Sequence, residues 1–259
     1  MDSGSKIFQR RASVRGRNLR LAAPNIVTIA ALCTGLTSIV FASSGRADLA
    51  VFSVLAAALL DGCDGGIARL TGGETRFGGE LDSLSEMVCF GAAPAFILYE
   101  WQLAGYGLTG WVSCLALAAC CALRLARFSG TAETPPASPW RRGYFTGIPA
   151  PCGAFLALLP ICAAKAGWID SDSARTLALA GTPLIGLLMV SRWPTFSGET
   201  TGRSASKIRL LAPIFLGVAA GMSLGAWPWP TLVAAGLIYA ATLPLSRWRY
   251  NRNLRIKGV

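Results

Sequence analysis

The sequence predicts an all-α, polytopic membrane helix bundle, and three observations support that fold class. Of the 259 residues, 53% are hydrophobic and only 14% are charged, whereas an ordinary soluble domain carries roughly 25% charged residues. The mean hydropathy is +0.49. The apolar residues also gather into stretches of about 20, the length that a helix needs to cross the hydrocarbon core of a bilayer.

Eight stretches are long and apolar enough to be transmembrane helices. We expect them over 24–43, 47–70, 78–100, 109–128, 147–168, 173–192, 208–226 and 229–246. The second, third and fourth contain charged residues near one end, so the count is about eight, with six to eight compatible with the pattern. The same division gives a basic cytoplasmic arm over 1–23, a transmembrane domain over 24–246 and a basic cytoplasmic tail over 247–259. The apolar run after the arm is too long for a secretory signal.

The distribution of basic residues predicts the orientation. With eight spans, 21 of the 24 Lys and Arg residues fall on the side of the N-terminus, and only Arg46, Lys165 and Arg175 fall on the other. Cytoplasmic loops of membrane proteins are enriched in Lys and Arg. We therefore expect an even number of spans, with both termini cytoplasmic, in a bacterial inner (plasma) membrane. The net charge of +11 is then explained by orientation and by contacts with lipid headgroups, and we expect no nucleic-acid partner.

Composition also limits the possible chemistry. The chain contains no histidine, which excludes His-based catalytic triads and His-ligated metal sites. The eight cysteines lie almost entirely in apolar runs and form no Cys-x-x-Cys pair, as expected of reduced structural thiols. Any catalysis would therefore depend on carboxylates, hydroxyls, thiols, Lys or Arg, and the carboxylates are the first candidates.

Six of the thirteen acidic residues fall within 26 positions, namely Asp61, Asp64, Glu74, Glu80, Asp82 and Glu86. Ionisable residues in a span are costly and point to function. Asp61 and Asp64 are three residues apart, and Asp82 and Glu86 are four apart, so each pair shares a helix face. We expect the two helices to lie side by side and aim the four carboxylates at one point, where they would not all stay ionised unless a cation neutralised them. Oxygen ligands suit Mg²⁺, Mn²⁺ or Ca²⁺, and these cations usually take part in phosphate chemistry.

Small and basic residues surround these acids. Gly65, Ala68 and Gly78 have small side chains or none, so a sizeable ligand could approach the backbone beside the carboxylates. Arg69 and Arg76 could hold phosphate oxygens. The alternative is that the aspartates form interhelical hydrogen bonds and the small residues serve helix packing.

The pattern Asp61-x-x-Asp64-Gly65-x-x-Ala68-Arg69, followed after eight residues by Gly78-x-x-x-Asp82-x-x-x-Glu86, resembles the signature of the CDP-alcohol phosphatidyltransferase family. The resemblance implies that the acids bind two divalent metals, which engage the pyrophosphate of a CDP-linked lipid. An acceptor alcohol then attacks the lipid-side phosphorus, and CMP leaves. The resemblance also implies a homodimer.

One position departs from the family pattern. The family has aspartate at the last position, usually assigned as the base that deprotonates the acceptor, whereas this chain has Glu86. The glutamate carboxylate lies one methylene further out, and a misplacement of about 1 Å can cost on the order of 10²-fold in rate. The resemblance thus makes Glu86 both a metal ligand and the candidate base.

Further motifs are similar to the membrane-integral phosphatidylserine synthases of this family. They are Pro24-Asn25-x-x-Thr28, Leu81-Asp82-Ser83-Leu84, Phe90-Gly91-x-x-Pro94-Ala95, Arg124-Leu125-Ala126-Arg127-Phe128 and Tyr144 to Pro151. This similarity implies transfer of the phosphatidyl group of CDP-diacylglycerol to L-serine. Asn25 and Thr28 then join Gly65, Ala68, Arg69 and Gly78 as residues that bind the CDP-lipid.

Four arginines are candidates for the acceptor or for phosphate. Arg124 and Arg127 share a helix face and could bind a carboxylate or the lipid phosphate. Arg141 and Arg142 could lie at the rim of the substrate site. All four could equally be ordinary cytoplasmic loop charges. Two other functions stay open: the same chemistry with glycerol 3-phosphate, an inositol phosphate or choline, and a small cation transporter with the acids as its ion path. We favour phosphotransfer because the acids lie at one end of their helices, beside arginines.

Overall fold

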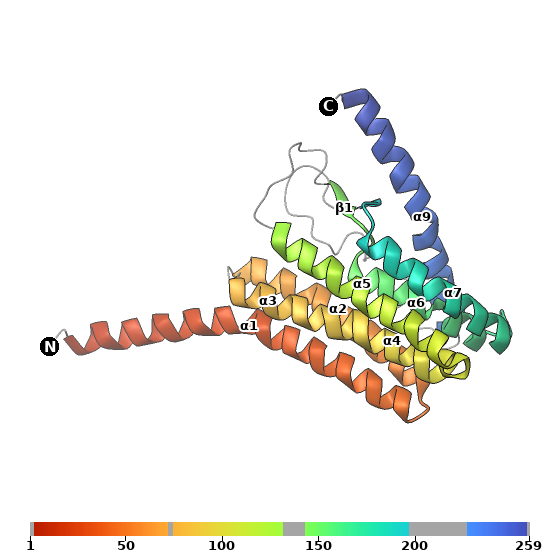
Figure 1. Ribbon diagram of the computed structural model, residues 1–259. Coiled ribbons are helices and arrows are strands. Elements are labelled where there is room, and N and C mark those ends of the chain that lie inside the picture. The colour runs from red at the N-terminus through yellow and green to blue at the C-terminus, as the bar shows by residue number, and fades with distance from the viewer. Residues whose placement is uncertain (1–2, 72–74, 132–142, 197–226, 258–259) are drawn as a thin grey trace.

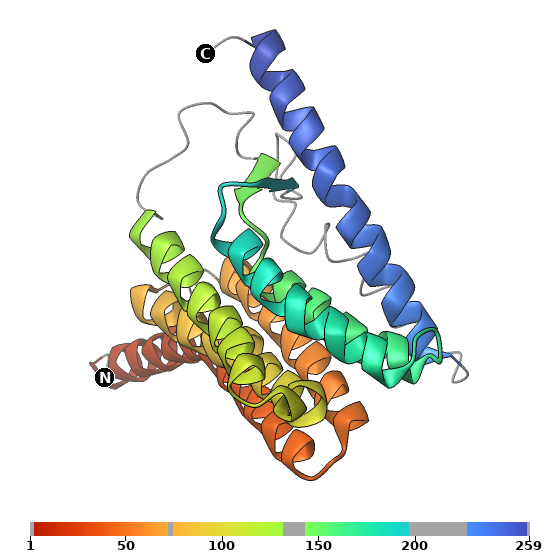
Figure 2. The ribbon, with the colours of Figure 1, turned by 45° about the vertical axis from the view of Figure 1, so that its right-hand side comes forward.

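The computed structural model describes residues 3–71, 75–131, 143–196 and 227–257, which form a bundle of helices with one small sheet (Figures 1 and 2). The long helices are α1 (Ser3–Ser43), α2 (Ala47–Thr71), α5 (Leu108–Thr131), α6 (Ala150–Lys165), α7 (Ser171–Val190) and α9 (Pro228–Lys257). Between α2 and α5 runs a series of consecutive helical segments: α3 (Arg76–Glu86), the π-helix η1 (Met87–Ala92), α4 (Ala93–Leu98), the π-helix η2 (Tyr99–Leu103) and the 3₁₀ turn η3 (Ala104–Tyr106).

The predicted fold class is confirmed. Six helical segments in the described ranges are long and apolar enough to cross a membrane, and they lie over Ala22–Ser43, Ala47–Ala68, Arg76–Tyr106, Leu108–Phe128, Ser171–Val190 and Pro228–Arg255. Each overlaps a predicted span, while the predicted span over 208–226 lies outside the described residues. The domain boundaries at 23 and 246 and the cytoplasmic location of both termini stay predictions. The N-terminal part of α1 projects away from the bundle (Figure 1).

The predicted span over 147–168 is wrong in its boundaries. The helix α6 covers only Ala150–Lys165, 16 residues, which is shorter than a typical membrane-spanning helix. At its start Gly147 has φ +81°, and a Cβ there would lie 2.2 Å from the Met189 carbonyl oxygen. At its end Gly167 has φ +72°. Both backbone conformations favour glycine and end the helix on either side.

Helix α6 is instead a core element of the bundle. Ten of its residues are buried, including Phe155, Leu158 and Ile161. They pack in one apolar cluster with Phe90 of η1 and Leu117 of α5. A helix that is apolar on all sides is stable when neighbouring helices cover it, so hydropathy alone does not distinguish this buried helix from a lipid-facing span.

Close contacts between α1 and the α3–η1 region hold the carboxylate end of the bundle in place. Gly35 allows α1 to approach closely, since a Cβ there would lie 2.4 Å from the Cys89 sulfur. The Cys89 thiol donates to the Ala31 carbonyl oxygen at 3.3 Å, and the Ser85 hydroxyl donates to the Thr28 carbonyl oxygen at 3.3 Å. These side chains thereby fix the register of α1 against α3.

A two-stranded antiparallel sheet, which the sequence analysis did not predict, joins the bundle to α9. Strand β1 (Tyr144–Thr146) pairs with β2 (Pro194–Phe196), Phe145 facing Thr195. The Trp193 indole donates to the Leu243 carbonyl oxygen at 3.1 Å, which attaches this sheet to α9. Figure 2 shows the sheet lying beside α9.

The first turn of α7 has a pH-sensitive cap. The Asp170 carboxylate accepts hydrogen bonds from the Ser173 hydroxyl at 2.7 Å, the Ser173 N–H at 2.9 Å and the Asp172 N–H at 3.1 Å. These bonds, that of the Ser173 hydroxyl foremost, lower the pKa of Asp170 below its ordinary value. The cap therefore stabilises the helix end above the unfolded-state pKa of about 3.9, and this contribution is lost as the pH falls through the lower folded-state pKa.

We expect hydrogen-exchange protection of the Asp172 and Ser173 amides to decrease as the pH is lowered below about 4. The Asp170→Asn variant keeps a capping acceptor without a titrating group, so its protection factors should lose this pH dependence. An unchanged pH profile in the variant would show that Asp170 is not the responsible group. Protection factors from exchange measured by mass spectrometry provide the readout.

Candidate functional site

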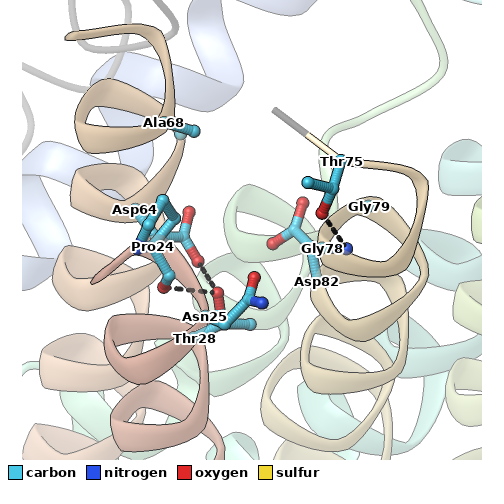
Figure 3. Close-up of a pocket in the computed structure, with 10 residues that line it drawn as sticks. Pro24, Asn25, Thr28, Asp64, Ala68, Thr75, Gly78, Gly79 and Asp82 are labelled. Carbon is cyan, nitrogen blue, oxygen red and sulfur yellow. Dashed lines mark hydrogen bonds between the residues drawn. The ribbon is translucent and has the colours of Figure 1, made fainter. Parts of the chain in front are cut away.

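The carboxylate end of the bundle contains a cavity of about 200 Å³ between α1, α2 and α3 (Figure 3). It is lined by Pro24, Asn25, Thr28, Asp64, Gly65, Ala68, Thr75, Gly78, Gly79 and Asp82. The membrane part of α1 begins at this end, α2 finishes there and α3 begins there. The structure thus brings together seven residues that the sequence analysis selected: Asn25, Thr28, Asp64, Gly65, Ala68, Gly78 and Asp82.

Three aspartates form a compact acidic group beside this cavity. Asp61, Asp64 and Asp82 each offer one carboxylate oxygen, and these atoms lie within 4.8 Å of one another. Asp64 is only 5% exposed. Three carboxylates so close repel one another unless a cation offsets their negative charge. The all-oxygen donor set, drawn from two helices, fits a hard divalent cation such as Mg²⁺ or Mn²⁺.

The fourth predicted acid, Glu86, is not a member of this three-aspartate group. It is buried, and its Oε2 lies 3.6 Å from Nη1 of Arg124 on α5. Glu86 is one helical turn beyond Asp82, where α3 contacts α5. The Arg124 Nε is also buried and makes no hydrogen bond to any described residue. The structure therefore pairs the candidate base with the candidate acceptor-binding cation.

Thr28 holds one of the three aspartates. Its Oγ1 lies 2.6 Å from Oδ2 of Asp64 and 3.1 Å from the Pro24 carbonyl oxygen. A hydroxyl has one proton to donate, and the shorter contact with a carboxylate is the stronger one because it is charge-assisted. Thr28 is itself buried and receives the Ser85 contact on its carbonyl oxygen. It therefore orients Asp64 within the acidic group, as outer-sphere partners orient metal ligands.

We expect Thr28→Val to weaken Mn²⁺ binding by roughly 10- to 100-fold, the usual cost of losing a hydrogen bond to a metal ligand. Valine keeps the shape but removes the donor. The matched control is Thr34→Val on the same helix, because within the described part of the chain the Thr34 hydroxyl hydrogen-bonds only to the Ala30 carbonyl oxygen. Titration followed by Mn²⁺ electron paramagnetic resonance measures both variants, and equal affinities would show that Thr28 does not support the site.

The first turn of α3 forms the opposite wall of the cavity. Thr75 caps this helix, because its Oγ1 accepts from the Gly78 N–H at 3.0 Å. A Cβ on Gly78 would lie 3.0 Å from Asn25 Oδ1 and 3.1 Å from Thr75 Oγ1, so only glycine leaves this approach open. The helix dipole also favours an anion at this end. Thr75 was not among the residues predicted from the sequence, although a threonine directly before a helix is a recognisable N-cap signal.

The four other predicted arginines are not among the described residues that line this cavity. Arg127 is exposed near the end of α5 and donates to the Val190 carbonyl oxygen of α7 at 2.6 Å. Arg69 lies on α2, and its side chain is outside the described part. Arg141 and Arg142 also lie outside the described residues. The roles predicted for these four arginines stay predictions.

Comparison with known proteins places these residues in a family. The CDP-alcohol phosphatidyltransferase family matches residues 21–193. The chain belongs to this family. Its members use divalent metal, and the match includes every residue of the cavity and of the acidic group.

Several relatives of this chain are named CDP-diacylglycerol–serine O-phosphatidyltransferase. The Mycobacterium leprae protein is 39% identical over 186 residues, which cover 70% of this chain and 60% of the relative. The Helicobacter pylori (strain 26695) protein is 35% identical over 67% of this chain and 72% of its own length. The Methanocaldococcus jannaschii protein is 37% identical over 67% of this chain and 74% of its own length. The match thus spans only about 60% of the mycobacterial relative.

Proposed function

We propose that this chain transfers the phosphatidyl group of CDP-diacylglycerol to L-serine, giving phosphatidylserine and CMP. The observation that carries the proposal is the convergence of Asp61, Asp64 and Asp82 on one point beside a cavity at the end of the bundle. The names of the relatives support serine as the acceptor.

Each wall of the cavity has a role in holding the donor lipid. Asp61, Asp64 and Asp82 would hold one or two Mg²⁺ or Mn²⁺ ions, which would offset the charge of the pyrophosphate. Gly78 leaves space for the cytidine nucleotide next to Asn25, and the N-terminal end of α3 favours the phosphate charge. We include Gly65, Ala68 and Arg69 in this donor site on the family pattern. The acyl chains can remain in the bilayer, since the cavity lies where membrane-spanning helices begin and end.

Glu86 is the proposed base. The serine hydroxyl oxygen bonds to the phosphorus of the phosphatidyl group, its proton passes to the Glu86 carboxylate, and the bond from that phosphorus to the CMP oxygen breaks. The Arg124 guanidinium lies 3.6 Å from the Glu86 carboxylate and holds it in place as an ion pair. The same arginine has further donors with which to bind the carboxylate of serine. The proposal also includes Glu86 as an additional metal ligand. It includes Arg127, Arg141 and Arg142 as contacts for the acceptor or for phosphate.

The location and assembly of the enzyme are also proposed. The excess of basic residues on one side supports a cavity that faces the cytoplasm, in a bacterial inner membrane with both termini cytoplasmic. Family resemblance supports a homodimer.

An acceptor screen tests the proposal. The purified chain is incubated with CDP-diacylglycerol, Mg²⁺ or Mn²⁺, and either L-serine, glycerol 3-phosphate, an inositol phosphate or choline, and CMP release is followed. We expect CMP to form with serine only. Release with another alcohol and not with serine would reassign the acceptor. Metal flux in proteoliposomes without any CMP release would instead favour a cation transporter, which the one-ended position of the three aspartates disfavours.

A further inference from the structure

A second cavity, of about 440 Å³, lies outside the site described above. It is formed where the η2–η3 segment meets the first turns of α7, and it is lined by Glu100, Trp101, Gln102, Ala104, Gly105, Tyr106, Asp172, Arg175 and Thr176. Its lining shares no residue with the cavity beside the three aspartates.

The second cavity lies at the opposite end of the bundle. Asp82 and Glu100 are separated by 18 residues of one continuous helical run, which corresponds to about 27 Å at 1.5 Å per residue. This separation is close to the hydrocarbon thickness of a bilayer, about 30 Å. The two cavities therefore lie near opposite membrane surfaces. Tyr and Trp are typical of the membrane–water interface, and this end of the bundle has Tyr106, 39% exposed, and Trp168, 52% exposed.

One buried acceptor in the wall of this cavity has no donor in the part of the chain that the structure describes. Gln102 is only 7% exposed, and its Oε1 is buried without a hydrogen-bond partner among the described residues. Leaving such a group unsatisfied is costly, so its presence in a cavity wall points to a ligand that brings an N–H or O–H group. The neighbouring Trp101 is held in place, because the Lys165 ammonium lies 4.8 Å from its ring centre and also pairs with Asp48 at 2.6 Å.

The charges around the cavity are of both signs. Glu100 and Asp172 provide carboxylates, and Arg175 provides a guanidinium that contacts Asp172 at 3.1 Å. Arg175 contributes one nitrogen to that contact, and a guanidinium has five N–H donors. A ligand that matches this lining carries a cationic donor for Glu100 and Gln102 and an anionic oxygen for Arg175.

We propose that this cavity binds the headgroup of an aminophospholipid at the membrane surface opposite the aspartate site. The primary ammonium donates to Gln102 Oε1 and Glu100, and the phosphodiester accepts from Arg175. A choline headgroup has the same charges but no N–H to donate, and a glycerol headgroup has no cation. The site therefore selects ethanolamine-type over choline-type and glycerol-type lipids.

The test measures binding by thermal stabilisation of the full chain in detergent. Short-chain phosphatidylethanolamine, phosphatidylcholine and phosphatidylglycerol are titrated separately, and free O-phosphoethanolamine provides a fourth titration. We expect a saturable rise in melting temperature with phosphatidylethanolamine, at least about tenfold tighter than with the other two lipids. Equal responses to the three lipids would overturn the proposal. Binding of free O-phosphoethanolamine as tightly as the lipid would also overturn it, since the site would then take a soluble amine.

Two variants locate the effect. Glu100→Gln removes an exposed charge and should weaken phosphatidylethanolamine binding about tenfold, whereas the matched control Glu80→Gln, which removes an exposed charge at the other end of the same helical run, should not. Gln102→Leu removes the buried acceptor at similar volume, so the lipid-free melting temperature should be kept or raised while the lipid response is lost. A Gln102→Leu protein that melts lower without lipid yet keeps its full lipid response would contradict the proposal.

Discussion

Replacing Asp82 by asparagine is expected to lower metal-dependent CMP release by at least roughly 10²- to 10³-fold, the scale seen when one preorganised electrostatic group is removed from an active site. Asparagine keeps the size of the side chain but removes one of three carboxylates that lie within 4.8 Å of one another. The same change relieves repulsion between like charges. We therefore expect the metal-free melting temperature of Asp82→Asn to equal or exceed that of the unaltered chain.

The matched control for this variant is Glu80→Gln. Glu80 is exposed on the same helix, two residues earlier, and belongs neither to the cavity lining nor to the three-aspartate group. Both variants lose one negative charge, so a general effect of net charge would appear in both. CMP release and melting temperature are measured for each. Normal turnover by Asp82→Asn would remove Asp82 from the proposed metal site.

The second large effect is expected at the Glu86–Arg124 pair. Both side chains are largely buried, with 11% and 13% of their area exposed. Removing one partner of a buried ion pair leaves an uncompensated charge and typically costs about 3–5 kcal/mol of stability. We therefore expect Arg124→Met to lower the melting temperature strongly. Glu86→Gln should lower CMP release by about 10²- to 10⁴-fold, the usual contribution of a general base.

The double variant separates stability from catalysis. Glu86→Gln combined with Arg124→Met removes both charges, and replacing a buried pair by neutral groups is often neutral for stability. We expect the double variant to recover much of the stability that Arg124→Met loses while CMP release stays low. Full activity of Glu86→Gln would show that another group accepts the proton. Glu86→Asp tests the extra methylene directly, since it restores the family residue.

The sequence predicted most of the helices because hydropathy over about 20 residues reports burial in lipid or protein. It did not predict the shortness of α6, because Pro149 and the glycines at 147 and 167 end a helix through backbone conformation, which hydropathy ignores. It also missed the sheet, where Phe145 pairs with Thr195, 50 residues away. Pairings between such short strands leave no periodic pattern in the sequence.

Only part of the site could be predicted from the sequence, because spacing along one helix does not report contacts between helices. Spacings of three and four residues place Asp61 near Asp64, and Asp82 near Glu86, on single helix faces. Such spacing does not show which neighbour each side chain meets, and Arg124, 38 residues after Glu86, pairs with it in the folded chain. The hydrogen bond from Thr28 to Asp64 spans 36 residues. Thr28 could be identified as the partner of Asp64 only once α1 and α2 were placed side by side.

We propose that Asp61, Asp64 and Asp82 form a metal site that supports phosphatidyl transfer. Electron paramagnetic resonance of Mn²⁺ titrated into the chelator-treated chain, with CMP release from CDP-diacylglycerol and serine measured in the same samples, tests it most directly. We expect saturable Mn²⁺ binding, and CMP release that rises with the same dissociation constant and is lost together with binding in Asp82→Asn. Undiminished CMP release from samples that contain no bound metal would show that phosphatidyl transfer does not depend on a metal at these aspartates.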